Sequence, residues 1–348
     1  MPSAVRIAGL QLVLCGCAQL LGVDDVVYRG GDDGAAEAMT DASPEAIADV
    51  VVDVSPPSCD GPCPATTLTT KGGLLATLAT DGTNVFFRTI DTVWSCAITG
   101  CGSAKSVAST SSTGLQVAAA SSNLVVWTDG TKVLGCPPGS CGIPKTYVDF
   151  TPKAVTGLAA SPISSFVLAS GGDGSLLSVH RISLDGVTDT PVFSGSPGGG
   201  APGPVAAVPG ASQVYWSQVG TPTLYDCAAT SCAQPDHTVS STGGTPSALL
   251  ATPAALFVLS AAGLYIAPSP ISATQTFLAA SIAGMTITTT STARIYFANG
   301  TTIQSCSTTP PCSSPVTHHT GATAISAIAA DDVALYWIEG SSVMRMEL

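Results

Sequence analysis

The twelve cysteines are the residues of this sequence whose spacing most clearly predicts chemistry. Ten of them form five close pairs, at Cys59/Cys63, Cys96/Cys101, Cys136/Cys141, Cys227/Cys232 and Cys306/Cys312. A structural zinc site needs four ligands that converge on one ion, whereas successive pairs lie roughly 40 or more residues apart. Regular close pairs are typical of disulfides formed in an oxidising compartment. We therefore expect five disulfides, each within its own pair, and no metal site.

Other side chains able to do acid–base chemistry are scattered. His318 and His319 are adjacent, and adjacent strand residues point to opposite faces, so the two imidazoles are not expected to share a metal. We expect them on a surface strand. Asp81 and the pair Asp331-Asp332 each follow an apolar run, where aspartates most often cap turns.

Two short motifs suggest a binding or modification site only faintly. The run Gly171-Gly172-Asp173-Gly174-Ser175 lacks the further acids of a calcium loop and the lysine of a phosphate loop, which favours a plain turn. Asn299-Gly300-Thr301 fits a glycosylation sequon, but a tight hairpin explains it better. These residues assemble no Ser-His-Asp set, so we predict no catalytic residue and no cofactor.

These residues belong to a unit that recurs along the chain, most clearly at residues 124–141. Two β-prone runs are joined there by Asp129-Gly130, a strong signal for a type I′ hairpin, which needs positive φ at both central residues. The aromatic or apolar second strand recurs seven times: Val85-Phe86-Phe87, Val125-Val126-Trp127, Phe166-Val167-Leu168, Val214-Tyr215-Trp216, Leu256-Phe257-Val258, Ile295-Tyr296-Phe297 and Leu335-Tyr336-Trp337. Four short strands in about 40 residues are typical of a propeller blade. We predict an all-β, seven-bladed β-propeller of four-stranded antiparallel blades over residues 59–348.

The first strand of each predicted blade lines the central channel, where a propeller usually has its site. None of these seven runs contains His, Glu, Lys, Arg or Cys: residues 74–80, 115–121, 155–161, 204–210, 247–253, 284–290 and 324–330. Hydrolysis or lyase chemistry needs positioned acids, bases or a metal. An enzyme would therefore depend on loop acids such as Asp173, Asp226 or Asp236. A long glycine-rich loop is expected at residues 194–203.

The seventh repeat reaches the end of the chain after its third strand, residues 342–348. Residues 64–70, at the other end of the repeat region, form a β-prone run with no blade of its own. We predict that these two segments pair and that the N-terminal strand is the outermost strand of the last blade. Such closure removes two exposed sheet edges.

Residues 1–17 resemble a bacterial lipoprotein signal peptide. Arg6 gives a positive start, and the apolar residues 7–14 are too short to span a bilayer. Leu14-Cys15-Gly16-Cys17 resembles a lipobox, which implies cleavage before Cys17 and lipid on Cys17. Ala18 resembles the sorting pattern of outer-membrane lipoproteins. The alternative is a plain secretory signal.

An acidic segment follows the predicted signal. Residues 18–60 contain ten acidic residues and one basic residue, so most of the net charge of −12 lies there. Such a segment buries too little apolar surface to offset the entropy of ordering, so residues 18–58 are expected to form a tether. The acidic balance argues against nucleic acid as a partner.

The sequence also resembles known propellers. Val126-Trp127-Thr128-Asp129 resembles the Tyr-Trp-Thr-Asp motif of low-density-lipoprotein-receptor-type propellers, although Val replaces Tyr and those propellers have six blades. Tyr215-Trp216-Ser217 and Tyr336-Trp337-Ile338 are partial matches. The whole chain resembles uncharacterised bacterial lipoproteins with a cysteine-braced propeller, which implies no particular ligand.

We therefore expect a binding or scaffold module of the cell envelope, anchored to the outer membrane by its N-terminal lipid and facing the periplasm or the cell surface. Its expected partner is an unknown protein or glycan. Two alternatives stay open: a propeller enzyme acting on envelope or extracellular polysaccharide, and a purely structural envelope protein.

Overall fold

The computed structural model describes residues 64–348 apart from short stretches at 111–115, 120–123, 139–140, 161–165, 173–176, 184–188, 196–200, 209–212, 229, 231, 272–274, 281, 288–293, 309–311 and 313. The chain divides into Met1–Asp53 and Val54–Leu348, and the described residues belong to the second unit. The predicted signal peptide and tether, with Cys17, Cys59 and Cys63, lie outside the described residues. None of the described residues belongs to a helix long and apolar enough to cross a membrane.

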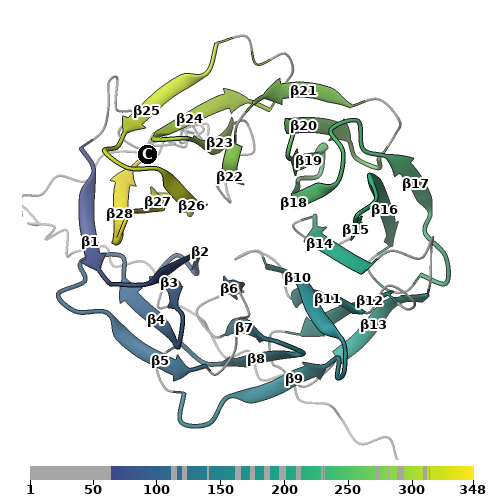
Figure 1. Ribbon diagram of the computed structural model, residues 1–348, viewed down its shortest axis with the longest axis horizontal. Coiled ribbons are helices and arrows are strands. Elements are labelled where there is room, and N and C mark those ends of the chain that lie inside the picture. The colour runs from purple at the N-terminus through teal and green to yellow at the C-terminus, as the bar shows by residue number, and fades with distance from the viewer. Residues whose placement is uncertain are drawn as a thin grey trace, which may run out of the picture. The chain divides into compact units, whose positions relative to one another are not determined.

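Within this part of the chain, 28 strands form seven four-stranded antiparallel sheets arranged as blades around a centre (Figure 1). This confirms the predicted seven-bladed propeller. Blade 1 consists of β2–β5, blade 2 of β6–β9, blade 3 of β10–β13, blade 4 of β14–β17, blade 5 of β18–β21 and blade 6 of β22–β25, while blade 7 combines β26–β28 with β1.

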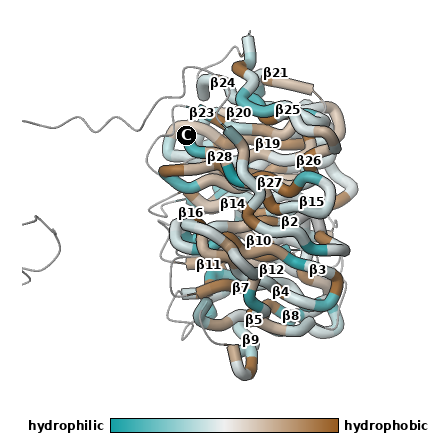
Figure 2. The backbone as a smooth tube through the Cα atoms, turned by 90° about the vertical axis from the view of Figure 1, so that its left-hand side faces the viewer, coloured by the Kyte–Doolittle hydropathy of each residue, from teal (hydrophilic) through white to brown (hydrophobic). Residues whose placement is uncertain are grey.

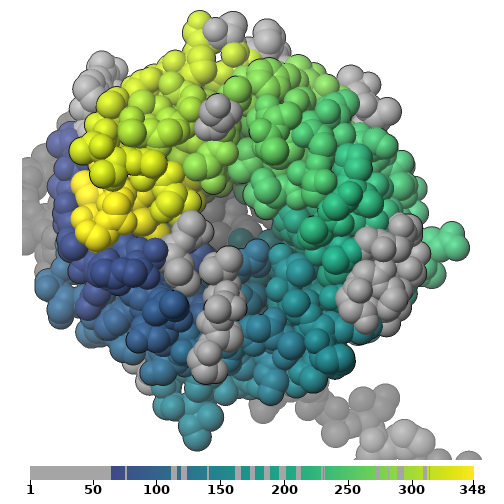
Figure 3. All heavy atoms as spheres, in the orientation of Figure 1, coloured from purple at the N-terminus to yellow at the C-terminus, as the bar shows by residue number. Residues whose placement is uncertain are grey.

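Each blade has its strands in the same order from the centre outward. The innermost strands are β2 (Leu74–Thr80), β6 (Val117–Ala119), β10 (Ala154–Ala160), β14 (Ala201–Ala207), β18 (Pro246–Ala251), β22 (Ile282–Ile287) and β26 (Ile325–Ala330). The second strands are β3 (Asn84–Thr89), β7 (Val125–Asp129), β11 (Phe166–Gly172), β15 (Gln213–Val219), β19 (Ala255–Ser260), β23 (Arg294–Asn299) and β27 (Ala334–Glu339). Figure 3 shows one face of the ring hollowed at its centre, where the innermost strands lie.

Two further strands complete each blade toward the rim. The third strands are β4 (Thr92–Ala97), β8 (Lys132–Cys136), β12 (Leu177–Ser183), β16 (Thr223–Ala228), β20 (Gly263–Pro268), β24 (Thr302–Ser307) and β28 (Ser342–Glu347). The outermost strands are β5 (Lys105–Ser109), β9 (Lys145–Asp149), β13 (Asp189–Gly195), β17 (His237–Ser240), β21 (Thr276–Ala279), β25 (Val316–Thr320) and β1 (Thr66–Thr70).

The hydrophobic core is divided among the contacts between blades. Each of the seven clusters of buried residues joins two neighbouring blades, so every blade buries both of its faces. This explains why the second strands are continuous apolar runs: all residues of β11 and β19 are buried. The outer strands are mostly exposed, as in β17. Hydrophobic and hydrophilic segments therefore alternate along the chain in Figure 2.

The hairpins that join the second and third strands of blades 2 and 6 begin one residue later than predicted. Asp129 pairs with Lys132 and Asn299 pairs with Thr302, so Gly130 and Gly300 take the first turn positions. Both glycines have a φ near +60°, at 63° and 60°. Positive φ at the first turn position is the feature that only glycine adopts without strain, and the acidic or amide residue ends the strand.

The largest departure from the predicted boundaries lies at blade 4. The innermost strand was expected at residues 204–210, but β14 is Ala201–Ala207 and includes Pro202 and Pro204. A proline is tolerated there because the innermost strand pairs on one side only. The predicted loop at residues 194–203 is shortened accordingly, since β13 extends to Gly195.

The ring closes by pairing of the two ends of the repeat region, as predicted. Antiparallel pairing places Thr66 opposite Arg345 and Thr70 opposite Ser342, and the backbone N–H of Lys71 donates to Ser341 O at 2.8 Å. In Figure 1, β1 (purple) lies beside β28 (yellow).

A protein truncated before Ser342 should lose its cooperative thermal transition and aggregate, because β1 is left unpaired and blade 7 retains only two strands. Differential scanning calorimetry and size-exclusion chromatography measure both effects. Deleting residues 20–53, which precede the propeller, is the control and should leave the melting temperature unchanged. A protein starting at Gly72 that keeps the full-length melting temperature would contradict the closure.

Candidate functional site

The aspartates that follow the innermost strands cap turns, as predicted. Asp81 Oδ1 accepts hydrogen bonds from the backbone N–H groups of Thr83 at 2.8 Å and Asn84 at 2.6 Å. Asp331 Oδ1 does the same for Val333 at 2.9 Å and Ala334 at 2.8 Å. These carboxylates are therefore occupied by their own turns and do not form a catalytic pair.

In three blades the second strand has a buried tryptophan near its end, followed by one intervening residue and then a polar residue. The pairs are Trp127 and Asp129 in blade 2, Trp216 and Gln218 in blade 4, and Trp337 and Glu339 in blade 7. Residues two apart on a strand share a face, so each polar group lies beside its indole and faces the preceding blade. In blade 7, Trp337 Nε1 donates to Glu339 Oε2 at 3.2 Å.

The same carboxylate connects blades 6 and 7. His319 is on β25, and its Nε2 lies 3.0 Å from Glu339 Oε2. The backbone N–H of Ala322 donates to Glu339 Oε1 at 2.7 Å. Gly321 leaves room for this contact, because a Cβ at that position would collide with Glu339. Burial raises the pKa of Glu339, but the hydrogen bonds from His319, Trp337 and Ala322 more than offset burial, so the pKa lies below its usual value.

His319 occupies a position that is apolar in five of the other six blades. It lies opposite Ile303 on the third strand. Five other blades place an apolar residue there, Ala108, Val148, Phe193, Val239 and Ala279, and blade 7 places Thr69. A carboxylate that fixes an imidazole is an arrangement able to support general base catalysis. Here the imidazole joins two blades, and among the described residues no group of three or more His, Cys, Asp or Glu side chains is placed to hold a metal ion.

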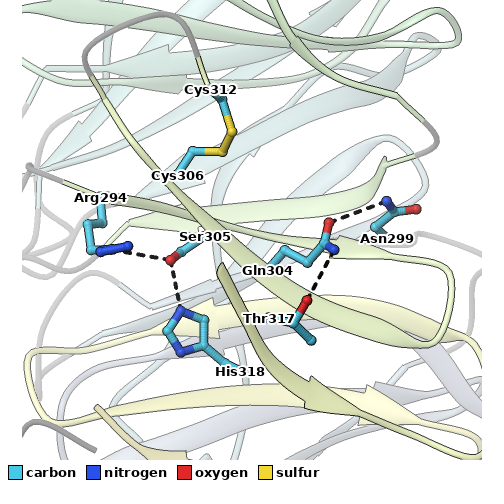
Figure 4. The surroundings of a disulfide bond; sticks show 8 residues. All are labelled: Arg294, Asn299, Gln304, Ser305, Cys306, Cys312, Thr317 and His318. Carbon is cyan, nitrogen blue, oxygen red and sulfur yellow. Dashed lines mark hydrogen bonds between the residues drawn. A yellow bond between two sulfur atoms is a disulfide. The ribbon is translucent and has the colours of Figure 1, made fainter. Parts of the chain in front are cut away.

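The neighbouring His318 points to the other face of β25, as predicted for adjacent strand residues. Its Nε2 lies 2.8 Å from Ser305 Oγ, and Arg294 Nε donates to the same oxygen at 3.3 Å (Figure 4). Burial, and then the charge of Arg294, lower the pKa of His318, which favours a neutral imidazole. A serine beside a neutral histidine resembles a nucleophile with its base. Ser305 is 0% exposed, however, so no substrate reaches its hydroxyl and the group acts as a packing network.

Of the loop acids proposed for an enzyme, Asp226 is fully buried on β16. Its Oδ1 lies 2.8 Å from His237 Nδ1, and its Oδ2 accepts a hydrogen bond from Ile271 N in blade 5 at 3.2 Å. The carboxylate thus ties blade 4 to blade 5.

The other two loop acids do not join Asp226 in a site. Asp236 is exposed and accepts a hydrogen bond from Ala228 N at 3.1 Å. Asp173 lies outside the described residues, as do Gly174 and Ser175 of the glycine-rich run. Asn299 of the sequon ends β23 and donates to Gln304 Oε1 at 3.4 Å.

One buried charge was not singled out in the sequence. Arg88 is 0% exposed, and its guanidinium donates to Thr128 O and to Thr110 Oγ1, each at 2.9 Å. Burial lowers the pKa of Arg88, and Asp129 partly offsets this effect. Thr128 and Asp129 belong to blade 2, so Arg88 joins blade 1 to blade 2. The sequence signal that could have identified this residue is an arginine within an otherwise apolar strand.

Three of the predicted disulfides are bonded: Cys96–Cys101, Cys136–Cys141 and Cys306–Cys312. Each braces the connection between a third strand and an outermost strand. Cys227 and Cys232 are present as two thiols, and burial raises the pKa of both. Cys232 Sγ lies 2.9 Å from Gln234 O. The predicted Cys227–Cys232 bond stays a prediction, and Cys59 and Cys63 lie outside the described residues.

Comparison with known proteins identifies the fold. No protein-family model matches the chain, and no curated protein matches it. Similar solved structures include streptogramin B lyase, with 10% identity, a TM-score of 0.64, and coverage of 82% of this chain and 97% of that chain. The computationally designed Ika8 protein matches with 13% identity, a TM-score of 0.53, and coverage of 81% and 98%. A nidogen/laminin complex matches with 15% identity, a TM-score of 0.49, and coverage of 65% and 89%. At such identities the first two show a shared propeller fold and nothing of activity.

Glu339→Gln should lower the free energy of unfolding at pH 7 by about 2 kcal/mol, because charge-assisted hydrogen bonds from His319, Trp337 and Ala322 are weakened. Since the folded-state pKa of Glu339 is lowered, this stability is present above the unfolded pKa of about 4.3 and is lost as pH falls through the folded value. The difference from wild type should therefore shrink below about pH 4. Urea denaturation at several pH values measures it.

Glu347→Gln is the matched control, because Glu347 is exposed and its ion pair among the described residues is with Arg345 at the surface. We expect it to change stability by less than about 0.5 kcal/mol at every pH. Equal effects of the two substitutions would contradict the role assigned to Glu339.

Peptide mapping of the natively folded, unreduced protein should recover Cys227 and Cys232 bonded to each other within one peptide, as their spacing predicts. Alkylation before digestion distinguishes the states, because linked cysteines are not labelled. Labelling of both residues, with Cys96, Cys136 and Cys306 protected, would show that this pair stays reduced.

Proposed function

We propose that this chain is a lipid-anchored β-propeller of the cell envelope that serves as a binding or scaffold module. The observation that carries the proposal is the combination of a closed ring of seven blades with disulfide braces inside three of them. Disulfides persist in oxidising compartments, which supports a place outside the cytoplasm. The lipobox resemblance at Cys17 supplies the anchor in this proposal.

A role in binding is supported by the way the polar side chains are used. Arg88, Asp226 and Glu339 hold neighbouring blades together, and Asp81 and Asp331 cap turns. The ring therefore works as a rigid frame that presents loops on its two faces, and such loops are where binding residues concentrate. A polysaccharide-cleaving enzyme would need acids that converge, whereas Asp226 is buried in a blade contact.

The proposed class of partner follows from the net charge of the chain and from its proposed place in the cell envelope. A net charge of −12 disfavours nucleic acid, so we propose a protein or glycan of the envelope as the partner. The acidic residues 18–58 would act as a spacer between the outer membrane and the propeller.

Cys17→Ala should release the protein from the membrane fraction, because the proposed lipid attaches to that thiol. Cell fractionation followed by immunoblotting measures the distribution, and metabolic labelling with a fatty acid detects the lipid directly. Cys15→Ala is the control and should stay lipidated and membrane-bound. Membrane retention of the Cys17→Ala protein, with loss in the Cys15→Ala protein, would contradict the assignment.

A further inference from the structure

A hollow of about 410 Å³ opens in blade 1 beside the Cys96–Cys101 disulfide. Its walls include Asn84, Ser95 and Lys105 and the loop residues 100–103. Small-molecule sites in proteins usually measure about 300–1,000 Å³, so the hollow is large enough for one small ligand.

Strand register places the three polar side chains on one face of the blade. Ser95 on β4 lies opposite Lys105 on β5 and opposite Phe86 on β3. Asn84 is two residues from Phe86, so it shares that face. Phe86 packs against blade 2, which shows that this is the face directed toward that blade.

Two of these side chains have no partner within the described part of the chain. Ser95 is only 7% exposed, yet its hydroxyl makes no hydrogen bond there. Lys105 is exposed and forms no ion pair with the described residues. The Ser95 Oγ is not one of the fully buried polar atoms that lack a partner, so it is open to the hollow, where water or a ligand hydroxyl can bind it.

In blade 6, side chains occupy the position that corresponds to this hollow. Ser305 corresponds to Ser95, because each precedes the first cysteine of its disulfide and lies opposite the aromatic residue of the second strand. In blade 6, Arg294 and His318 close around Ser305 and use its hydroxyl (Figure 4). The register places Asn84 where Arg294 is, and the shorter side chain leaves the space in blade 1 open.

We propose that the hollow beside Cys96–Cys101 binds a sugar acid, a small ring that carries hydroxyl groups and one carboxylate. The Lys105 ammonium binds the carboxylate, and the Ser95 hydroxyl and the Asn84 amide oxygen bind ligand hydroxyls. The Asn84 amide is already oriented, since its Nδ2 donates to Asp81 Oδ2 at 3.4 Å. The ligand is a uronic acid unit of an acidic polysaccharide or a free sugar acid. The inference deepens the proposed binding function and rests on it for its biological setting.

Isothermal titration calorimetry of the full chain with sodium glucuronate tests the site. We expect saturable binding, with glucose at least about tenfold weaker because it lacks the carboxylate. Lys105→Gln and Ser95→Ala should each weaken glucuronate binding by about tenfold. Lys132→Gln is the charge-matched control: the Lys132 side chain is 44% exposed, pairs with Asp149 at 3.6 Å and lies outside the hollow, so affinity should not change.

A tetramer of uronic acid distinguishes the two sources of ligand. Tighter binding than the monomer identifies a polysaccharide chain, and equal or weaker binding identifies a free sugar acid. Absence of glucuronate binding, equal affinity for glucose, or equal effects of Lys105→Gln and Lys132→Gln would overturn the proposal. Lys105 is exposed, so its substitution tests binding without disturbing the fold. The Cys17→Ala fractionation is read separately, so failure of the anchor and failure of this site are distinguishable.

Discussion

The pairing of β1 with β28 is the constraint on which the rest of the structure depends. Each blade buries both faces against its neighbours, so the arrangement is stable only as a complete ring. Leu68 on β1 packs in the same cluster as Val85 of blade 1 and Tyr336 of blade 7. The closing strand therefore completes a sheet and also fills the apolar contact between the last blade and the first.

Polar contacts between blades add specificity to a core built from similar apolar clusters. A buried charge is costly without a partner, and each of these charges finds its partner in a neighbouring blade. Arg88 needs Thr128 O of blade 2, Asp226 needs Ile271 N of blade 5, and Glu339 needs His319 of blade 6. Each of these polar contacts is specific to one pair of neighbouring blades. They therefore distinguish blade interfaces that are otherwise similarly apolar, and they disfavour packing of the blades in a different order.

The architecture could be predicted from sequence because a propeller is built from local hairpins that repeat. The aromatic second strands mark each blade without knowledge of any other blade, and the turn glycines Gly130 and Gly300 mark the hairpins of blades 2 and 6 in the same way. Boundaries failed where local signals conflicted: Pro202 and Pro204 indicate a loop, but the one-sided pairing of β14 accepts them.

The polar networks could not be predicted in the same way. Arg88 and Thr128 are 40 residues apart, and Asp226 and Ile271 are 45 residues apart. No sequence spacing shows which strand faces which across two blades. The divergence of His318 and His319 could be predicted from strand geometry alone, but their partners Ser305 and Glu339 could not.

The outermost position of β1 has a mechanical consequence. Every residue before Thr66 joins the propeller through this strand, so tension along the N-terminal segment is delivered first to the pair Thr66 and Arg345. A load directed across the sheet separates β1 from β28 one backbone hydrogen bond at a time, from Thr66 toward Thr70, whereas a load along the strand strains all these bonds together. Peeling needs far less force than shearing all bonds of a strand together. The strand that closes the ring is therefore also the strand through which a load on the N-terminal segment reaches the propeller.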